Sequence, residues 1–341
     1  MPSDQEVSFL THSKYIHAFQ LLVYDPSPLP HQNMYDYLKT RFLYEDMLPQ
    51  SRLTGIDLGQ VRSSLYAAWG TDTLLSMTGR FADEDELLRL SNNWSAIQVY
   101  YIFYYCTQAL HAAKKQPRPR SHTSTQGLFY DYWGKRRVYL PPWSLAYGAS
   151  GPKNAPPTFT PNLNVNPWTL CAGDNIWNLA CKAIKTTRQR SLVEKRHDLR
   201  EKKKTEIIKA WKVREAVRIL EGKKPRSKKP FPLSNLSNEE KTLLDSELRP
   251  FTIMDYLYRV RIKTNYEDSN MFSYGPTDIA SSQLIRNAFC TIGSGTLLLH
   301  ELAIRNLVGR DIFLIWVDEW IQRNMPEYLV NGLRARQPYL I

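Results

Sequence analysis

The chain has 341 residues, 43% of them hydrophobic, and carries 45 Lys and Arg against 33 Asp and Glu, a formal net charge of +12. This length can bury a sizeable core, in one large domain or two smaller ones. The four cysteines are scattered without a C-x-x-C pair, which argues against a zinc site or a disulfide framework and, with no cofactor motif, predicts neither metal nor cofactor. No apolar run reads as a membrane span and the first residues do not resemble a signal peptide, so we expect a cytoplasmic chain.

The excess positive charge lies in one segment. Residues 182–229 contain 19 Lys and Arg against 6 Asp and Glu, a local net charge of +13, so the rest of the chain sums to −1. Such a concentration of charge produces a strong local field, and its usual partner is a polyanion. Like charges one helical turn apart also destabilise a helix unless something compensates them. The segment therefore predicts binding to nucleic acid, DNA or RNA, and leaves two alternatives: a solvated helix face, or docking onto an acidic protein surface.

Apolar periodicity predicts helices along most of the chain. In chain order they cover 35–43, 58–77, 86–90, 94–114, 177–220, 252–264, 277–308 and 311–324, with a further helix restarting at 237. We expect Ser91-Asn92-Asn93 to cap the helix of 94–114, which is apolar all round and therefore belongs in the middle of a bundle. The helix of 177–220 is either one long helix or a helical hairpin. The helix of 277–308 is expected to kink or break at Gly293-Ser294-Gly295.

Two segments far apart in the chain share a recognisable pattern. Residues 94–129 read WSAIQVYYIFYYCTQALHAAKKQPRPRSHTSTQGLF and residues 256–272 read YLYRVRIKTNYEDSNMF. The combination resembles the HEPN superfamily, helical bundles named for nucleotide binding in prokaryotes and higher eukaryotes, and the length is similar to that of YaaC-like bacterial proteins. The matching positions are Tyr100, Tyr101, Phe103, Ala109, Leu110, Ser121, His122, Arg259, Arg261, Tyr266 and Asp268.

The resemblance implies an all-α fold with a discontinuous bundle. We expect the HEPN-like bundle to comprise residues 58–130 and 250–324. Residues 131–249 would form a long aromatic-rich loop and a basic helical insertion, residues 1–57 an N-terminal helical extension, and residues 325–341 a C-terminal tail. The family also implies a subunit of a bacterial multi-protein system in antiphage defence or a toxin–antitoxin pair, with a protein partner or a second copy of the chain.

The candidate site residues fall into two groups. Basic residues expected to contact nucleic acid are Arg118, Arg120, His122, Arg188, Arg190, Arg196, Arg200, Lys202, Lys203, Lys204, Lys209, Lys212 and Arg214. The corner residues Arg259, Arg261, Tyr266 and Asp268 either contact a ligand or lock the corner through an Arg–Asp pair.

A ribonuclease is the main alternative to a binding subunit. Active HEPN ribonucleases carry an Arg followed by a His with four to six residues between them; the Arg holds the phosphate and the His moves a proton without a metal. This chain lacks that pair before His300, near the closing helix where the family keeps it, and only Arg190 and His197 in the basic segment fit the spacing. We therefore expect binding without cleavage. A subunit that only docks on a protein partner is the third hypothesis.

Overall fold

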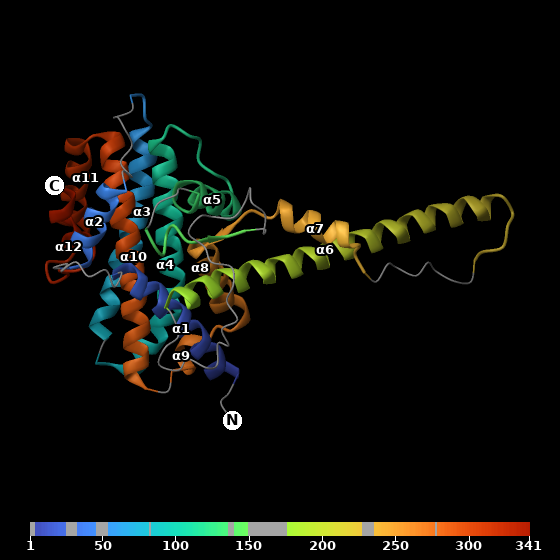
Figure 1. The fold of residues 1–341 in the computed structure, drawn as a ribbon, viewed down its shortest axis with the longest axis horizontal. Coiled ribbons are helices and arrows are strands. Elements are labelled where there is room, and N and C mark those ends of the chain that lie inside the picture. The colour runs from blue at the N-terminus through green and yellow to red at the C-terminus, as the bar shows by residue number, and fades with distance from the viewer. Residues whose placement is uncertain are drawn as a thin grey trace.

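The computed structural model describes residues 4–24, 33–45, 54–81, 83–135, 140–148, 176–226, 235–276 and 278–341. Within them the fold is an all-α helical bundle with a single pair of two-residue strands (Figure 1). The elements are α1 (Asp4–Tyr24), α2 (Met34–Tyr44), α3 (Leu58–Met77), α4 (Asp85–Ala113), α5 (His122–Phe129), β1 (Ala146–Tyr147), α6 (Ile176–Leu220), α7 (Asn238–Glu247), β2 (Phe251–Thr252), α8 (Ile253–Ile262), α9 (Met271–Tyr274), α10 (Ile279–Val308), α11 (Arg310–Asn324) and α12 (Leu333–Leu340). Residues 149–175 of the predicted aromatic-rich loop and 227–229 of the basic segment lie outside the described residues.

Helix α4 forms the centre of the bundle and packs against α3, α8, α9 and α10. Ile102, Phe103 and Cys106 are fully buried, which confirms that this helix belongs to the core. The predicted cap at Ser91 is wrong, because α4 already begins at Asp85 and runs through it. The Ser91 hydroxyl donates to the Leu88 carbonyl one turn back instead of capping a helix.

Helix α10 is continuous, so the break predicted at Gly293-Ser294-Gly295 is wrong. Both glycines allow close approach of other elements. A Cβ at Gly293 would lie 3.1 Å from Ile102 Cδ1, and one at Gly295 would lie 3.1 Å from Leu38 Cδ1 and from Trp143 Cζ2. A glycine costs a helix about 1 kcal/mol relative to alanine, and tight packing against α4 and α2 compensates for that cost here.

The two ends of the chain belong to the same core as the centre. We expected residues 1–57 to be an extension and 325–341 a tail, but α1 packs against α10, and α12 packs against α2, α3 and α10. Phe19 of α1, Phe42 of α2 and Leu340 of α12 are all fully buried in one hydrophobic cluster. The described part of the bundle therefore extends from α1 to α12.

Candidate nucleic-acid interface

Helix α6 leaves the bundle as a long projection (Figure 1). It is one helix of 45 residues rather than a hairpin, about 67 Å long at 1.5 Å per residue. Its first turns are anchored, because Leu179, Ala180 and Ile184 are buried in the core cluster. Leu192 is the last of its apolar side chains to be buried. We call residues 193–220, which lie beyond that anchor, the arm.

Ion pairs fix the direction in which α6 projects. Arg188 is 2% exposed and its Nη1 lies 2.6 Å from Asp245 Oδ1 at the end of α7. Its Nη2 donates to the carbonyls of Asp245 and Leu248, at 2.7 and 2.8 Å. Lys203 on the arm also pairs with Glu240 at the start of α7. We predicted that Arg188 contacts nucleic acid, but its donors are bonded inside the protein, so this structure gives it a structural role.

The arm carries cations that have no acidic partner among the described residues. They are Lys195, Arg196, Arg200, Lys202, Lys209, Lys212, Arg214 and Arg218. Because successive residues of a helix turn by about 100°, Arg200 and Lys209 lie on opposite sides of it. Cations without an acidic partner therefore face opposite sides of the arm, unlike those of an amphipathic helix with one charged face.

The structure does not bring Arg190 and His197 together with any further catalytic group. Arg190 lies in the anchored part of α6, where it forms ion pairs with Glu194 and Glu267, both at 3.3 Å. His197 is exposed on the arm, about two turns further along the helix, and has no hydrogen-bond partner among the described residues. A catalytic histidine needs a rigid environment that holds it against the reacting atoms. The arm provides none for His197.

A cluster of aromatic rings lies beside the base of the arm and surrounds His122. The Oη atom of Tyr100 is 2.7 Å from His122 Nδ1, and the rings of Tyr104 and Tyr258 lie 4.8 and 5.6 Å from the imidazole, centroid to centroid. The cluster joins α4, the start of α5 and α8. We call these rings, together with Tyr101, the tyrosine cluster.

Arg261 of α8 enters the same cluster. Its Nη2 donates to Tyr101 Oη at 3.0 Å, and its guanidinium lies 5.1 Å from the Tyr101 ring centroid and 5.6 Å from that of Tyr100. The Nε atom of Arg261 is buried without a hydrogen-bond partner in the structure. Aromatic rings in tilted and edge-on contact, with an arginine beside them, form a group that can bind bases and a phosphate.

Burial controls the protonation of this cluster. Burial, and then the nearby charge of Arg261, lowers the pKa of His122 below its ordinary value of 6.5. Burial also raises the pKa of the Tyr100 hydroxyl, so this group keeps its proton. At neutral pH the imidazole is therefore uncharged and can accept a proton from a ligand hydroxyl if Nε2 carries the lone pair.

The remaining predicted residues lie around the cluster. Arg118 and Arg120 are exposed in the loop between α4 and α5, and Arg118 Nε donates to Gln108 Oε1 at 3.1 Å. In the corner after α8, Arg259 pairs with Glu267 rather than with Asp268. Tyr266 is 74% exposed and free to contact a partner. The predicted Arg–Asp lock is thus an Arg–Glu pair.

A pocket of about 700 Å³ lies between α5, α6 and α8 at the base of the arm, and we call it the root pocket. Ser124, Lys195 and Tyr258 line it, so it is continuous with the tyrosine cluster through Tyr258. Gln126, a further lining residue, is 5% exposed and its Nε2 has no hydrogen-bond partner in the structure. A buried unpaired donor is unfavourable by about 1–3 kcal/mol, so a ligand acceptor at this position would be stabilised.

The described ranges contain neither a metal-binding cluster nor a membrane-spanning helix. No group of three or more His, Cys, Asp or Glu residues there could hold a metal ion. No helix of the described chain is both long enough and apolar enough to span a bilayer. Comparison with known proteins returned no matching family model, no matching curated protein and no matching solved structure. The HEPN resemblance stays a prediction.

Sequence patterns did not predict some of the residues that complete the site. Gln126, Tyr104 and Tyr258 were not singled out, and α5 itself was not predicted. A usable signal was present, because the side chain of Ser121 caps α5 by accepting from the Ser124 N–H. Nothing in the sequence pairs Arg261 with Tyr101, because 160 positions separate them.

Proposed function

We propose that this chain binds nucleic acid and that the arm makes the main contact. The observation that carries the proposal is the projection of α6: one helix, anchored at its base, with cations that lack an acidic partner on opposite sides of its free part. A helix that needed only to be soluble would tolerate mixed charges, whereas this one keeps an excess of like charge that destabilises it in isolation. Phosphates along a polynucleotide would compensate that repulsion.

The tyrosine cluster and the root pocket would add a second contact at the base of the arm. Stacking of a base on an aromatic side chain contributes about 1–3 kcal/mol and discriminates little between bases. Arg261, whose guanidinium lies over Tyr101, would contact the adjoining phosphate. Together the two contacts would bind a strand with high salt sensitivity and little sequence preference.

The biological setting of this proposal rests on the HEPN resemblance. That resemblance implies a nucleic-acid-binding subunit of a bacterial multi-protein system, in antiphage defence or a toxin–antitoxin pair, acting with a protein partner or a second copy. The central aromatic helix α4 and the convergence of its tyrosines with His122 and Arg261 support this view.

Charge reversal on the arm tests the binding proposal. In the variant Lys202→Glu, Lys209→Glu, Lys212→Glu, three exposed cations without acidic partners change sign. The control, Arg80→Glu, Arg310→Glu, Arg323→Glu, changes the net charge equally on exposed residues of the bundle. Fluorescence anisotropy with labelled single-stranded RNA, single-stranded DNA and duplex DNA gives affinities across a salt series. We expect the arm variant to bind at least about tenfold more weakly and the control to stay near wild type.

Three outcomes would contradict the proposal. Equal losses in both variants would mean that net charge, and not the arm, determines binding. Unchanged affinity and salt dependence in the arm variant would remove the arm as the contact, and absence of binding by the wild-type chain to all three probes would leave docking on a protein as the better hypothesis.

One observation favours a second function, a metal-independent ribonuclease. His122 and Arg261 converge on Tyr100, and the lowered pKa of His122 leaves its imidazole uncharged. Such a pair could take a proton from a 2′-hydroxyl while binding the adjacent phosphate. Cleavage of single-stranded RNA in EDTA that is lost in His122→Ala but kept in His197→Ala would support it. Intact RNA after prolonged incubation with wild type would exclude it for the isolated chain.

A further inference from the structure

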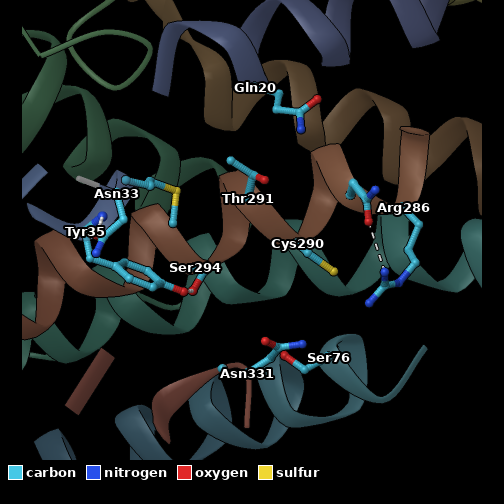
Figure 2. A pocket seen from close by; sticks show the side chains of 12 residues that line it. Gln20, Asn33, Tyr35, Ser76, Arg286, Cys290, Thr291, Ser294 and Asn331 are labelled. Atoms are coloured by element: carbon cyan, nitrogen blue, oxygen red, sulfur yellow. Dashed lines mark hydrogen bonds between the residues drawn. The ribbon is translucent and has the colours of Figure 1, made fainter. Parts of the chain in front are cut away.

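A second, polar pocket lies away from the arm. Its cavity of about 550 Å³ is formed where α1, α2, α3 and α10 meet the loop before α12 (Figure 2). Helices α2 and α12 lie on the side of the bundle opposite to the one from which α6 projects (Figure 1). The volume falls within the range of about 300–1,000 Å³ that is usual for small-molecule sites. We call this cavity the polar pocket.

Most of the residues that line the polar pocket carry an amide or a hydroxyl group. Gln20 comes from α1, Ser76 from α3, Thr291 from α10 and Asn331 from the loop before α12. Their side chains come from four separate parts of the chain and surround one space (Figure 2). A wall of neutral donors and acceptors favours a ligand rich in hydroxyl or amide groups, because an apolar ligand would leave these groups without hydrogen bonds.

Arg286 is the charged residue that lines the polar pocket among the described residues. Its Nε donates to Thr78 Oγ1 at 3.2 Å and its Nη1 to Asn287 Oδ1 at 3.0 Å. Both acceptors are neutral, and no carboxylate of the described chain pairs with this guanidinium. A half-buried arginine held by neutral groups retains its charge and its remaining donors for an oxyanion.

The floor of the polar pocket is held rigidly. Ser294 Oγ lies 2.9 Å from Tyr35 Oη and accepts from Arg336 Nη1 at 2.9 Å. Arg336 is fully buried and bound to Asp72 and Glu301, so its charge is neutralised inside the protein and does not attract a ligand. The hydroxyls of the floor are therefore oriented before any ligand arrives, which reduces the entropic cost of binding.

We propose that the polar pocket binds a small polyhydroxylated molecule that carries one oxyanion, with the phosphate or carboxylate on Arg286 and the hydroxyls on the amide and hydroxyl wall. A guanidinium binds the paired oxygens of a phosphate and of a carboxylate in the same way, so a ligand that carries either group would fit this site. The pocket shares no lining residue with the arm, the tyrosine cluster or the root pocket. It is a ligand site separate from the proposed nucleic-acid interface.

Binding of three sugars tests the proposal. Ribose 5-phosphate carries a phosphate, gluconate a carboxylate, and ribose neither. Saturation-transfer NMR and titration calorimetry on the full chain should show saturable binding of at least one of the two anions. Ribose should bind at least about tenfold more weakly, as expected for loss of a charge-assisted contact. Comparison of the two anions identifies the preferred oxyanion.

Two substitutions and one chemical reporter locate the site. Arg286→Gln should weaken binding of the anion at least about tenfold, whereas Arg323→Gln, the same change on an exposed residue, should not. Thr291→Val, which removes a lining hydroxyl with little change of shape, should weaken both the anion and ribose. Cys290, a half-buried lining residue, should be alkylated more slowly when the anion is bound, as followed by mass spectrometry of its peptide.

Several results would overturn the proposal. Failure of both anions to bind saturably would do so, as would ribose binding as tightly as they do. Binding that survives Arg286→Gln, or that leaves the alkylation rate of Cys290 unchanged, would place the ligand elsewhere. Thr291→Val and the Cys290 reporter keep the test decisive if Arg286→Gln does not fold.

Discussion

Arg336 and Glu301 form a two-pronged ion pair inside the bundle, with Nε 2.9 Å from Oε2 and Nη2 2.9 Å from Oε1. Both side chains are fully buried. Trp69 Nε1 donates to the same Oε1 at 2.8 Å, and Asp72 accepts from Arg336 Nη1 at 2.9 Å. Burial alone would lower the pKa of Arg336, but the two carboxylates raise it above its ordinary value. This network ties α12 to α3 and α10.

Removal of Arg336 should destabilise the protein strongly. The change Arg336→Met leaves two buried carboxylates without their cation, and breaking a buried pair in this way costs about 3–5 kcal/mol of unfolding free energy. The control is Arg62→Met, because Arg62 pairs with Glu319 at the surface and both side chains are about one-third exposed. Surface pairs contribute about 0–1 kcal/mol. Urea unfolding measures both variants, and a loss below 1 kcal/mol for Arg336→Met would contradict the role given to the network.

Two aromatic residues of α4 should differ sharply in their contribution to stability. Phe103 is fully buried, whereas Trp94, nine residues earlier on the same helix, is 66% exposed. Phe103→Ala should lower the unfolding free energy by about 3–5 kcal/mol, through lost burial and the cavity it leaves. Trp94→Ala should change it by less than about 1 kcal/mol. Thermal unfolding of the two variants side by side would refute the central position of α4 if they melted at similar temperatures.

The protein should become less stable as the pH is lowered, because one buried histidine resists protonation in the folded state. His300 is fully buried; its Nε2 accepts from Trp133 Nε1 at 3.1 Å and its Nδ1 contacts the Thr296 carbonyl at 2.8 Å. Burial lowers its pKa from 6.5 to about 4, although the bond to Thr296 acts in the opposite direction. The neutral imidazole is therefore the form that fits the fold.

The direction of this pH dependence follows from the pKa of His300 in the unfolded chain and its lower pKa in the folded chain. Above pH 6.5 His300 is neutral both folded and unfolded, and its stabilisation is complete. As the pH falls from 6.5 to about 4, the unfolded chain takes up a proton that the folded chain excludes, so about 3 kcal/mol is lost. His300→Gln should lose correspondingly less over this range in urea unfolding, whereas His197→Gln, at the exposed histidine of the arm, should follow wild type. Parallel pH profiles for all three proteins would exclude His300 as the cause.

Local patterns in the sequence predicted the helices that local chemistry determines. Helix α3 begins at Leu58 as its periodicity indicates, and α7 begins after Ser237, whose side chain and that of Glu240 form a capping box. The unbroken α10 could not be predicted, because what makes Gly295 favourable in a helix is its contact with Trp143 and Leu38, residues distant in sequence. Propensity alone disfavours a glycine there.

The site was predictable in charge but not in geometry. The clustering of Lys and Arg indicated a basic helix, yet the sequence treats Arg188 and Lys209 alike. Their difference arises from Asp245, 57 positions after Arg188, which comes within 2.6 Å only in the folded chain. The same holds for Arg336, whose carboxylate partners lie 35 and 264 positions away. Long-range contacts decide which charges are structural and which are available to a ligand.

This difference between Arg188 and Lys209 yields the last prediction. Arg188→Met removes a buried cation that holds α7 against α6 and leaves the carbonyls of Asp245 and Leu248 without this donor, so it should lower the unfolding free energy by about 1–3 kcal/mol. The folded fraction that remains should bind polynucleotides with the salt dependence of wild type. Lys209→Met removes an exposed cation of the arm and should leave stability within about 0.5 kcal/mol of wild type.

Salt titrations of polynucleotide binding then distinguish the role of Arg188 from that of Lys209. If Lys209 neutralises one phosphate of duplex DNA, its loss should reduce the slope of log affinity against log salt by about 0.9, because one counterion fewer is released. The same experiment on Arg188→Met should return the wild-type slope once affinities are corrected for the folded fraction. A reduced slope for Arg188→Met, or an unchanged slope for Lys209→Met, would show that the exposed cations of the arm are not those that meet the phosphates.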